Sequence, residues 1–201
     1  MKILAIGANG IIGRAVTNVL SNQHEVVAVG HSQGELTVDI EDITSIQALF
    51  EKVGQVDAII SMAGNGGMGS IAEMPSSGYA TVLNNKLMGQ VNIVRVGMEY
   101  LNEGGSITLT SGQASNYPIQ GTAAIAIGVA GINAFVGVAA LEFEQGKRIN
   151  AVSPSFVKET LEQWGADSSA GIPADDVAGF YQQSVEGTET GKVYNAVLAN
   201  N

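Results

Sequence analysis

Residues 2–13 read KILAIGANGIIG, an apolar run followed by glycines at positions 7, 10 and 13. The apolar run predicts a buried β-strand, and the residues after it predict a helix. Gly7 would allow the tight turn between them, Gly10 would let a ligand approach the backbone, and Gly13 would let the helix lie close to the strand. Because a helix N-terminus offers free N–H donors, this unit predicts a site for the pyrophosphate of a dinucleotide. The alternative is a tight turn that binds nothing.

The second apolar run ends at Val29-Gly30-His31-Ser32, without the Asp or Glu that would bind the ribose 2′-hydroxyl of NAD. His31, Ser32 and Arg14 could instead donate to a 2′-phosphate, which favours NADP over NAD. The alternative is that His31 is an ordinary surface histidine. The residues predicted to contact the cofactor in this half of the chain are Gly7, Asn9, Gly10, Ile11, Ile12, Gly13, Arg14, His31 and Ser32.

Apolar runs and segments with helical periodicity alternate along the chain. This order predicts an α/β fold, a doubly wound parallel sheet of Rossmann type with helices on both faces, which binds ligands at the carboxyl ends of its strands. The expected strands are 2–6, 25–29, 35–38, 58–61, 106–110, 148–152 and 192–198; the expected helices are 13–21, 42–53, 80–101 and 123–145, with a mobile loop at 160–173 and a short last helix after it.

The length of 201 residues favours one domain, 1–201, with the loop near 160–173 as a lid over a substrate site. Charged residues make up only 14% of the chain against ~25% in an average protein, so part of the surface is expected to be covered by something other than water. Glycine occupies 26 positions without a collagen-like repeat, and only 4 prolines occur, which excludes collagen and proline-rich disorder.

The net charge of −10 disfavours nucleic acid and anionic membranes as partners. With no cysteine and two isolated histidines, no metal site is expected. The first apolar stretch is too short for a secretory signal, so a cytoplasmic location is expected. The uncharged stretch 122–141 has the length of a membrane span, but the expected role is a helix buried on both sides, against its own sheet and a second subunit. We therefore expect a homodimer or homotetramer.

Several motifs in the same order resemble the short-chain dehydrogenase/reductase family. Besides the glycine loop, Asp39-Ile40 resembles its adenine-binding aspartate pair, and Ser61-Met62-Ala63-Gly64 its Asn-Asn-Ala-Gly strand end. Leu109-Thr110-Ser111-Gly112 is similar to the strand end with the catalytic serine, and 149–157 to the nicotinamide loop. The resemblance implies a nicotinamide cofactor, subunit contacts through the fourth and fifth helices, and further cofactor contacts at Asp39, Ile40, Met62, Ala63, Gly64, Pro154, Ser155, Phe156 and Val157.

The chain departs from this family at the catalytic Tyr-x-x-x-Lys pair. Aligning the fifth helix places Ile125 at the tyrosine position and Val129 at the lysine position, and neither side chain can move a proton. For the family's helix-four asparagine, alignment on Gly89 gives Lys86, and a shift by one residue gives Asn85; both stay open. The resemblance thus indicates an atypical branch of the family.

The candidate catalytic residues are Ser111, Tyr117, Asn85 and Lys86. Ser111 would orient the substrate, although a serine at a strand end is often only a turn or cap residue. Tyr117 would supply a proton, with a loop anchor before Pro118 as its alternative role. An apolar pocket for a small substrate is expected among residues 111–119, Phe156, Leu161, Trp164 and Ile172.

Two functions remain open at this point. The first is an NADP-dependent oxidoreductase with a non-standard active site that acts on a small carbonyl or alcohol. The alternative is a catalytically degenerate protein with the same fold that senses NADP(H) or interacts with a partner. A scaffold without cofactor is disfavoured by the intact glycine loop, and nothing in the sequence supports a non-redox reaction on a sugar nucleotide.

Overall fold

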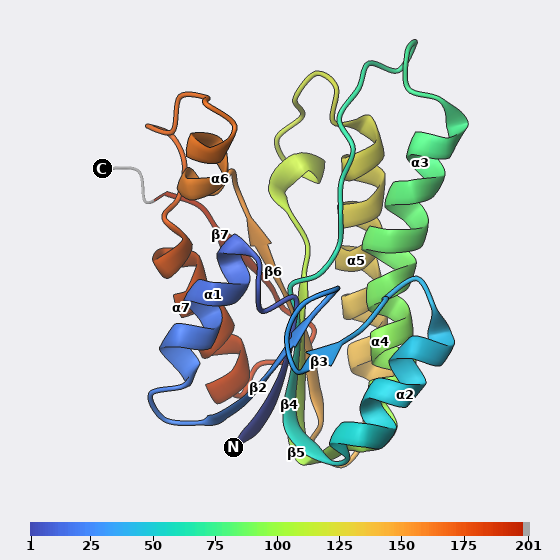
Figure 1. Ribbon diagram of the computed structural model, residues 1–201, viewed down its shortest axis with the longest axis vertical. Helices are drawn as coiled ribbons and strands as arrows, with labels where there is room; N and C mark the ends of the chain where they lie inside the picture. Colours follow the sequence, from blue (N-terminus) through green and yellow to red (C-terminus); the bar gives the residue numbers. More distant parts are fainter. Residues whose placement is uncertain (199–201) are drawn as a thin grey trace.

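Seven parallel strands form one sheet in the order β3-β2-β1-β4-β5-β6-β7 in the computed structural model, which describes residues 1–198 (Figure 1). The strand order reverses between β1 and β4, the place where open α/β sheets bind ligands. The predicted doubly wound α/β fold is therefore confirmed. The strands are β1 Lys2–Ile6, β2 Glu25–Gly30, β3 Leu36–Thr37, β4 Val56–Ser61, β5 Leu101–Thr110, β6 Arg148–Pro154 and β7 Val193–Ala196.

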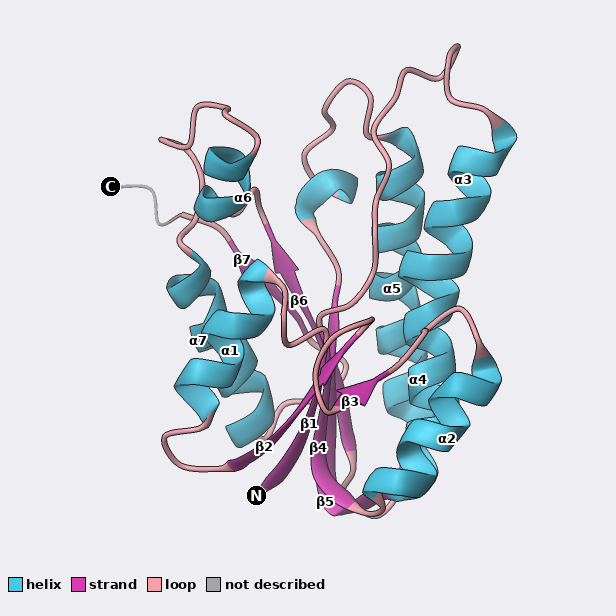
Figure 2. Ribbon diagram, viewed as in Figure 1, coloured by secondary structure: helices cyan, strands magenta, loops and turns pink. Residues whose placement is uncertain are grey.

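Helices cover both faces of the sheet (Figure 2). One face carries α1 Ile11–Leu20 and α7 Ala174–Glu186, with α6 Lys158–Gln163 above them at the carboxyl ends of the strands. The other face carries α2 Ile43–Val53, α3 Ser76–Val82, the π-helical segment η1 Leu83–Gly89, α4 Gln90–Gly97 and α5 Ala123–Glu142. Two short 3₁₀ turns, η2 Met98–Tyr100 and η3 Gln113–Ser115, flank β5.

The central strands form because their side chains are buried on both faces. Ala58, Ile59 and Ile60 of β4 are fully buried, as expected for the centre of a parallel sheet. On one side they join a core with α1 and α7, in which Tyr181 is the largest buried side chain, and on the other a core with α2, α4 and α5. A continuous apolar run is therefore the correct signal for these strands.

Local sequence sets where two helices begin. Asp42 caps α2, because its side chain accepts a hydrogen bond from Thr44 N. At the start of α7, the Glu159 carboxylate accepts from Ala174 N at 3.0 Å, and Asp175 and Asp176 lie in the positively polarised first turn. This contact also ties α6 to α7, so the segment between them is fixed at both ends.

Three predictions about these elements were wrong. The helix expected over 80–101 begins earlier, at Ser76, contains the π-helical segment, and ends before Leu101, which begins β5. The expected loop 160–173 begins inside a helix, α6, and its end is held by a bridge between Val157 and Ile172. The last strand, expected over 192–198, covers only Val193–Ala196.

Helix α5 is apolar on every side. Its inner face, with Val129, Ile132 and Val136, is buried against the sheet, whereas Ile127, Val138 and Leu141 on the outer face are 51%, 59% and 85% exposed. The helix is long and apolar enough to cross a membrane by length and composition, but core helices pass the same test. Within the described chain its inner face has a partner and its outer face does not.

Candidate functional site

The glycine loop between β1 and α1 is built as the spacing predicts. Gly7 has a positive φ of 87°, and a Cβ there would lie 2.8 Å from Ala63 N of the loop after β4. A Cβ on Gly13 would lie 2.1 Å from the Gly7 carbonyl oxygen. Both positions therefore require glycine, one for its backbone conformation and contact with the neighbouring strand, the other for the close approach of α1 to β1.

The first turn of α1 is open to an anion. Gly10 is the N-cap residue and provides no side-chain cap, and the first turn carries no acidic residue. The N–H groups of Ile11, Ile12 and Gly13 are those that a helix leaves without an intrahelical partner. A Cβ at Gly10 would meet only the Gly7 carbonyl oxygen, at 3.4 Å. These residues fit the pyrophosphate of a dinucleotide, which needs N–H donors, positive polarisation and space.

The segment after β2 is anchored to this loop through Asn9. Asn9 Nδ2 donates to the Gln33 carbonyl at 2.9 Å, and Arg14 Nη1 donates to the Asn9 carbonyl at 2.8 Å. Gly30 makes this possible, because a Cβ there would lie 2.1 Å from the Gln33 oxygen. The exposed side chains of His31 and Ser32 thus lie next to the glycine loop. Arg14 is a predicted cofactor contact, and one of its guanidinium nitrogens, Nη1, is already bound to the glycine loop.

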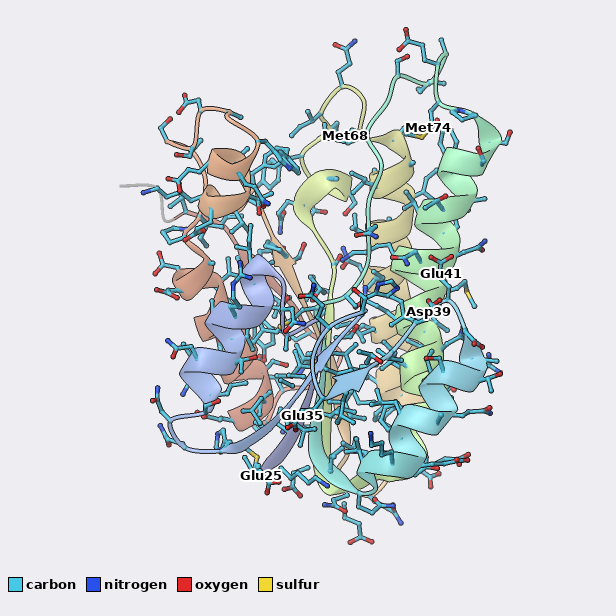
Figure 3. All side chains as sticks on the ribbon, viewed as in Figure 1. Glu25, Glu35, Asp39, Glu41, Met68 and Met74 are labelled. Carbon is cyan, nitrogen blue, oxygen red and sulfur yellow. The ribbon has the colours of Figure 1, made fainter. Side chains whose placement is uncertain are left out.

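The segments after β3 and β4 carry the residues that the resemblance assigns to further cofactor contacts. Met62 N continues the β1–β4 pairing by donating to Ile6 O at 2.8 Å, which brings Met62 and Ala63 against Gly7. Ile40 is 5% exposed, and its side chain lies against Gly89 on η1. The exposed Asp39 accepts from Glu41 N through its side chain (Figure 3).

At the end of β6, the predicted nicotinamide loop 154–157 is held by backbone hydrogen bonds. Ser155 N donates to Ala196 O at 2.9 Å, and the Phe156 carbonyl accepts from Ile172 N at 2.9 Å. Val157 is buried, whereas the Phe156 side chain is 39% exposed. Pro154 and Ser155 are partly buried. The loop therefore lies between β7 and α6 at the carboxyl edge of the sheet.

Ser111, directly after β5, is buried, and its hydroxyl donates to the carbonyl of Val129 on α5 at 3.1 Å. The hydroxyl proton is therefore directed at the helix. The two positions that align with the family's tyrosine and lysine are apolar here: Val129 is 1% exposed, and Ile125 contacts the segment after β4, since a Cβ at Gly66 would lie 2.9 Å from it.

Asn85 and Lys86, adjacent in η1, have different environments. Asn85 accepts from Asn65 N at 2.6 Å and donates to the Glu41 carboxylate at 2.7 Å, so both ends of its amide are bound to loops. The side chain of Lys86 passes along Gly64, whose Cβ would lie 2.7 Å from Lys86 Cδ. Burial lowers the pKa of Lys86 to about 8. Its ammonium forms no ion pair with a described residue.

Tyr117 lies apart from these contacts. Its side chain is 62% exposed, and its hydroxyl forms no hydrogen bond within residues 1–198. Its backbone N donates to the Gln113 carbonyl. The structure therefore places the four candidate catalytic residues in four settings: a serine bound to α5, an amide bound to loops, a partly buried amine and an exposed phenol.

Sequence reasoning missed two glutamines that fix the site. Gln90 is fully buried, and its side chain bonds both the N and the O of Thr110. Gln113 donates to Ser153 O at 2.8 Å and to Asn195 Oδ1 at 2.7 Å, which joins the end of β5 to β6 and β7. A glutamine at such positions gives no recognisable signal in a single sequence, because glutamine is ordinary on exposed helices and turns.

A cavity of about 640 Å³ lies on the outer side of α5. It is lined by residues that include Ser70, Ile71, Ser115 and Pro118, with Ala126, Ile127 and Ala130 of the helix. At ~100° per residue, Ile127 lies about 160° around the helix from the buried Val129, and Ala126 and Ala130 lie about 60° and 100° from it. The apolar pocket predicted from the sequence shares Ala114, Ser115, Pro118 and Ile119 with this cavity. Tyr117, Phe156, Leu161, Trp164 and Ile172 do not line it.

Comparison with known proteins agrees with this geometry. A family model described as enoyl-(acyl carrier protein) reductase matches residues 7–199. The hydroxynaphthalene reductase arp2 of Aspergillus fumigatus is 24% identical over 165 residues, which are 76% of this chain and 60% of the relative. The chain thus spans less than two thirds of the length of that enzyme.

Two solved structures resemble the chain over nearly its whole length. The protein lin1944 from Listeria innocua is 38% identical with a TM-score of 0.93, covering 97% of this chain and 98% of the other. A small-chain dehydrogenase in complex with NADPH is 27% identical with a TM-score of 0.87, covering 98% and 96%. With the parallel sheet, the glycine loop and the matched family model, the chain belongs to the short-chain dehydrogenase/reductase family, whose members bind a nicotinamide cofactor.

Proposed function

We propose that this protein is an NADP(H)-dependent oxidoreductase that interconverts a small carbonyl compound and its alcohol at a site without the Tyr-x-x-x-Lys pair. The observation that carries the proposal is the first turn of α1, which is uncapped, free of acidic residues and faced by a glycine loop that tolerates no side chain at Gly7 or Gly13. A protein that had given up its cofactor would have no need to keep this anion site.

The choice of NADP over NAD rests on the end of β2. The exposed His31 and Ser32 can donate to a 2′-phosphate, and the Asn9–Gln33 hydrogen bond holds their segment beside the pyrophosphate loop. No carboxylate occupies the position that would bind the ribose 2′-hydroxyl of NAD. The resemblance to an NADPH-bound small-chain dehydrogenase supports the same choice.

The remaining cofactor contacts follow the carboxyl edge of the sheet. Met62, Ala63 and Gly64 line the end of β4, and Pro154 to Val157 the end of β6, with Asp39 and Ile40 on the adenine side. The bound cofactor supplies a hydride to the substrate or accepts one from it. Protein groups must then hold the carbonyl oxygen and move a proton there, and Ser111, Lys86 and Tyr117 are the candidates.

We also propose that the protein is a cytoplasmic homodimer or homotetramer. The exposed side chains of Ile127, Ala130, Ala134, Val138 and Leu141 follow one face of α5 at helical spacing. An apolar stripe of this length, next to the cavity on the same side of the helix, suits the corresponding helix of a second copy. The fold relationship to lin1944 is consistent with a soluble protein.

One observation favours the alternative, an NADP(H)-binding sensor or interaction protein without turnover. The Ser111 hydroxyl donates to Val129 O instead of standing free for a substrate, and Ile125 and Val129 fill the usual catalytic positions with apolar groups. On this view the cofactor would bind and nothing would react.

Oxidation of NADPH in the presence of benzil or 4-nitrobenzaldehyde tests the proposal and separates it from the alternative. Wild-type protein should bind NADPH and oxidise it only when a carbonyl probe is present. Gly10→Ala should keep its fold, because the new Cβ meets the protein only at 3.4 Å, but should lose about tenfold or more in NADPH affinity because a methyl group blocks the phosphates.

The matched control is Gly179→Ala on α7, where a Cβ would meet nothing within 4 Å. This variant should bind and react like the wild type. Binding without oxidation of NADPH would support the sensor, and absence of binding would contradict both functions.

A further inference from the structure

We infer that Nζ of Lys86 is the group that exchanges a proton with the carbonyl oxygen of the substrate, in place of the missing tyrosine and lysine of α5. This inference rests on the proposed oxidoreductase function. It deepens that function by naming the acid and base of the reaction.

The inner face of α5 offers no proton carrier at the family's catalytic positions, since Ile125 and Val129 are apolar. Lys86 enters the same region from the opposite helix: its Cγ lies 3.9 Å from the Cβ position of Gly128, the residue that precedes Val129. The aliphatic part of the Lys86 side chain therefore lies beside the part of α5 that aligns with the family's pair.

The absence of a side chain at Gly64 leaves room for the side chain of Lys86. A Cβ at Gly64 would lie 2.7 Å from Lys86 Cδ and 3.2 Å from its Cα. Gly64 also has a positive φ of 128°, so both its backbone and the space beside it exclude other residues. Gly64 follows β4 at the carboxyl edge of the sheet. The side chain of Lys86, which passes Gly64, therefore lies at the edge where ligands bind.

Asn85 and Lys86 both lie in the π-helical segment η1. The five-residue repeat of η1 alters the direction of side chains, and π-turns occur frequently at functional sites. Here it sends Asn85 to Asn65 and Glu41, while Lys86 runs between Gly64 and Gly128. Gln90 Nε2 donates to the Lys86 carbonyl at 3.0 Å, which fixes the backbone of the lysine to the end of β5.

The surroundings of the Lys86 side chain carry no charge. They consist of the turn after β4, the inner face of α5 and Val82 on α3, and none of these described segments has a charged side chain. Burial alone lowers the pKa of Lys86 to about 8. Tyr79 on α3 precedes Lys86 by seven residues, and the Glu41 carboxylate accepts a hydrogen bond from Asn85, the residue next to Lys86. An ammonium buried without a counter-ion destabilises the fold, so the lysine is costly unless a ligand uses it.

In the direction of reduction, the carbonyl carbon would accept a hydride, which bound NADPH would supply on becoming NADP⁺. The electron pair of the C=O π bond moves to oxygen and takes a proton from Lys86 Nζ, so that an O–H bond forms and an N–H bond breaks. The neutral amine then takes a proton from water. In the direction of alcohol oxidation, the neutral amine accepts the hydroxyl proton.

The amine can be followed without turnover by acetylation with acetic anhydride over a range of pH, with mass spectrometry of the lysine peptides. Lys86 should react with a midpoint near its pKa of about 8, and the peptide of the exposed Lys52 serves as the internal reference. Saturating NADPH should slow acetylation of Lys86 at least tenfold and leave Lys52 unchanged. If NADPH binds but does not protect Lys86, the inference is wrong.

Variants then separate proton transfer from positive charge. Lys86→Met should bind NADPH and resist urea better than the wild type but lose carbonyl reduction by a hundredfold or more. Lys86→Arg keeps the charge but cannot release a proton near neutral pH, so it should fail in the same way. Lys52→Met, which removes an exposed lysine far from the edge, is the control.

The pH profile provides the last readout. Reduction of benzil by the wild type should fall as the pH rises through about 8, because the ammonium is the acid form, and the residual rate of Lys86→Met should not show this step. Equal rates for wild type and Lys86→Met would overturn the role of Lys86 while leaving the oxidoreductase intact. Absence of NADPH binding, or binding without any turnover, would overturn the oxidoreductase itself and the inference with it.

Discussion

The side chain of Gln90 bonds both backbone polar groups of Thr110: Nε2 donates to the Thr110 carbonyl at 2.9 Å, and Oε1 accepts from Thr110 N at 2.8 Å. Gln90 is fully buried, and Nε2 also donates to the Lys86 carbonyl. This single amide therefore joins the start of α4 and the π-helical segment to the end of β5, directly before Ser111. The relative position of the helix-four and strand-five candidates depends on it.

Gln90→Leu should destabilise the protein by about 3 kcal/mol, because it leaves a buried N–H and two buried carbonyls with fewer partners. Urea denaturation measures the change. Gln55→Leu is the matched control, since Gln55 is exposed and its side chain makes one hydrogen bond within residues 1–198, of 3.3 Å to Glu99 O. It should change the stability by about 0.5 kcal/mol or less. Equal effects of the two substitutions would mean that the Gln90 amide is not important for the fold.

His31→Asp should lower the affinity for NADPH by about tenfold or more and leave NADH unaffected or bound more tightly. The new carboxylate would repel a 2′-phosphate and could accept a hydrogen bond from the ribose 2′-hydroxyl of NADH. Fluorescence titration with both cofactors tests this. Gln55→Asp, which adds the same charge beyond the amino end of β4, should leave both affinities unchanged. If His31→Asp lost the binding of both NADPH and NADH, His31 would not determine the preference for NADPH over NADH.

Ala130→Arg should reduce the mass in solution to that of a monomer or make the protein insoluble. Ala130 is exposed on the outer stripe of α5, and an arginine there would bring a charge into an apolar contact between subunits. Light scattering coupled to gel filtration gives the mass. Gln183→Arg on the exposed side of α7 is the control and should keep the wild-type mass. A soluble, unchanged oligomer of Ala130→Arg would exclude this face as the interface.

The stability should depend on Glu186 in acid. His24 Nε2 lies 2.9 Å from Glu186 Oε1, and this hydrogen bond lowers the pKa of the carboxyl below its usual value of 4.5. Since the folded-state pKa is depressed, the stabilisation is complete above about pH 4.5 and is lost as the pH falls through the folded-state value.

Glu186→Gln should therefore be less stable than the wild type near neutral pH and lose less stability on acidification. Thermal unfolding between about pH 6 and pH 3 tests this against Glu103→Gln, an exposed carboxyl that forms no hydrogen bond with a described residue. Parallel acid profiles of wild type and Glu186→Gln would show that the pair does not contribute.

The centre of the sheet could be predicted because β1 and β4 are buried on both faces, so that residues 3–6 and 58–60 appear as unbroken apolar runs. The glycine loop could be predicted because Gly7 and Gly13 have no alternative: one contacts Ala63 N and the other the Gly7 carbonyl. Both features depend on residues near each other in the sequence or on simple burial.

The catalytic part could not be predicted to the same extent, because it depends on side-chain direction and long-range contacts. The π-helical register that separates Asn85 from Lys86 has no signature in the sequence, which is why both alignments stayed open. The six-residue helix α6 was missed because it is short and is followed by Gly, Ser and Pro residues. The hydrogen bond from Ser111 to Val129 O links residues 18 positions apart and follows only from the packing of α5 on β5.

The most direct test of the account is calorimetric titration of the purified wild-type protein with NADPH and, in parallel, with NADH. The account predicts saturable binding of NADPH, at least tenfold tighter than NADH, and a rise in unfolding free energy of about 2.7 kcal/mol at a hundredfold excess over Kd. Failure of both cofactors to bind, with the fold intact, would contradict the oxidoreductase, the sensor and the role of Lys86 together.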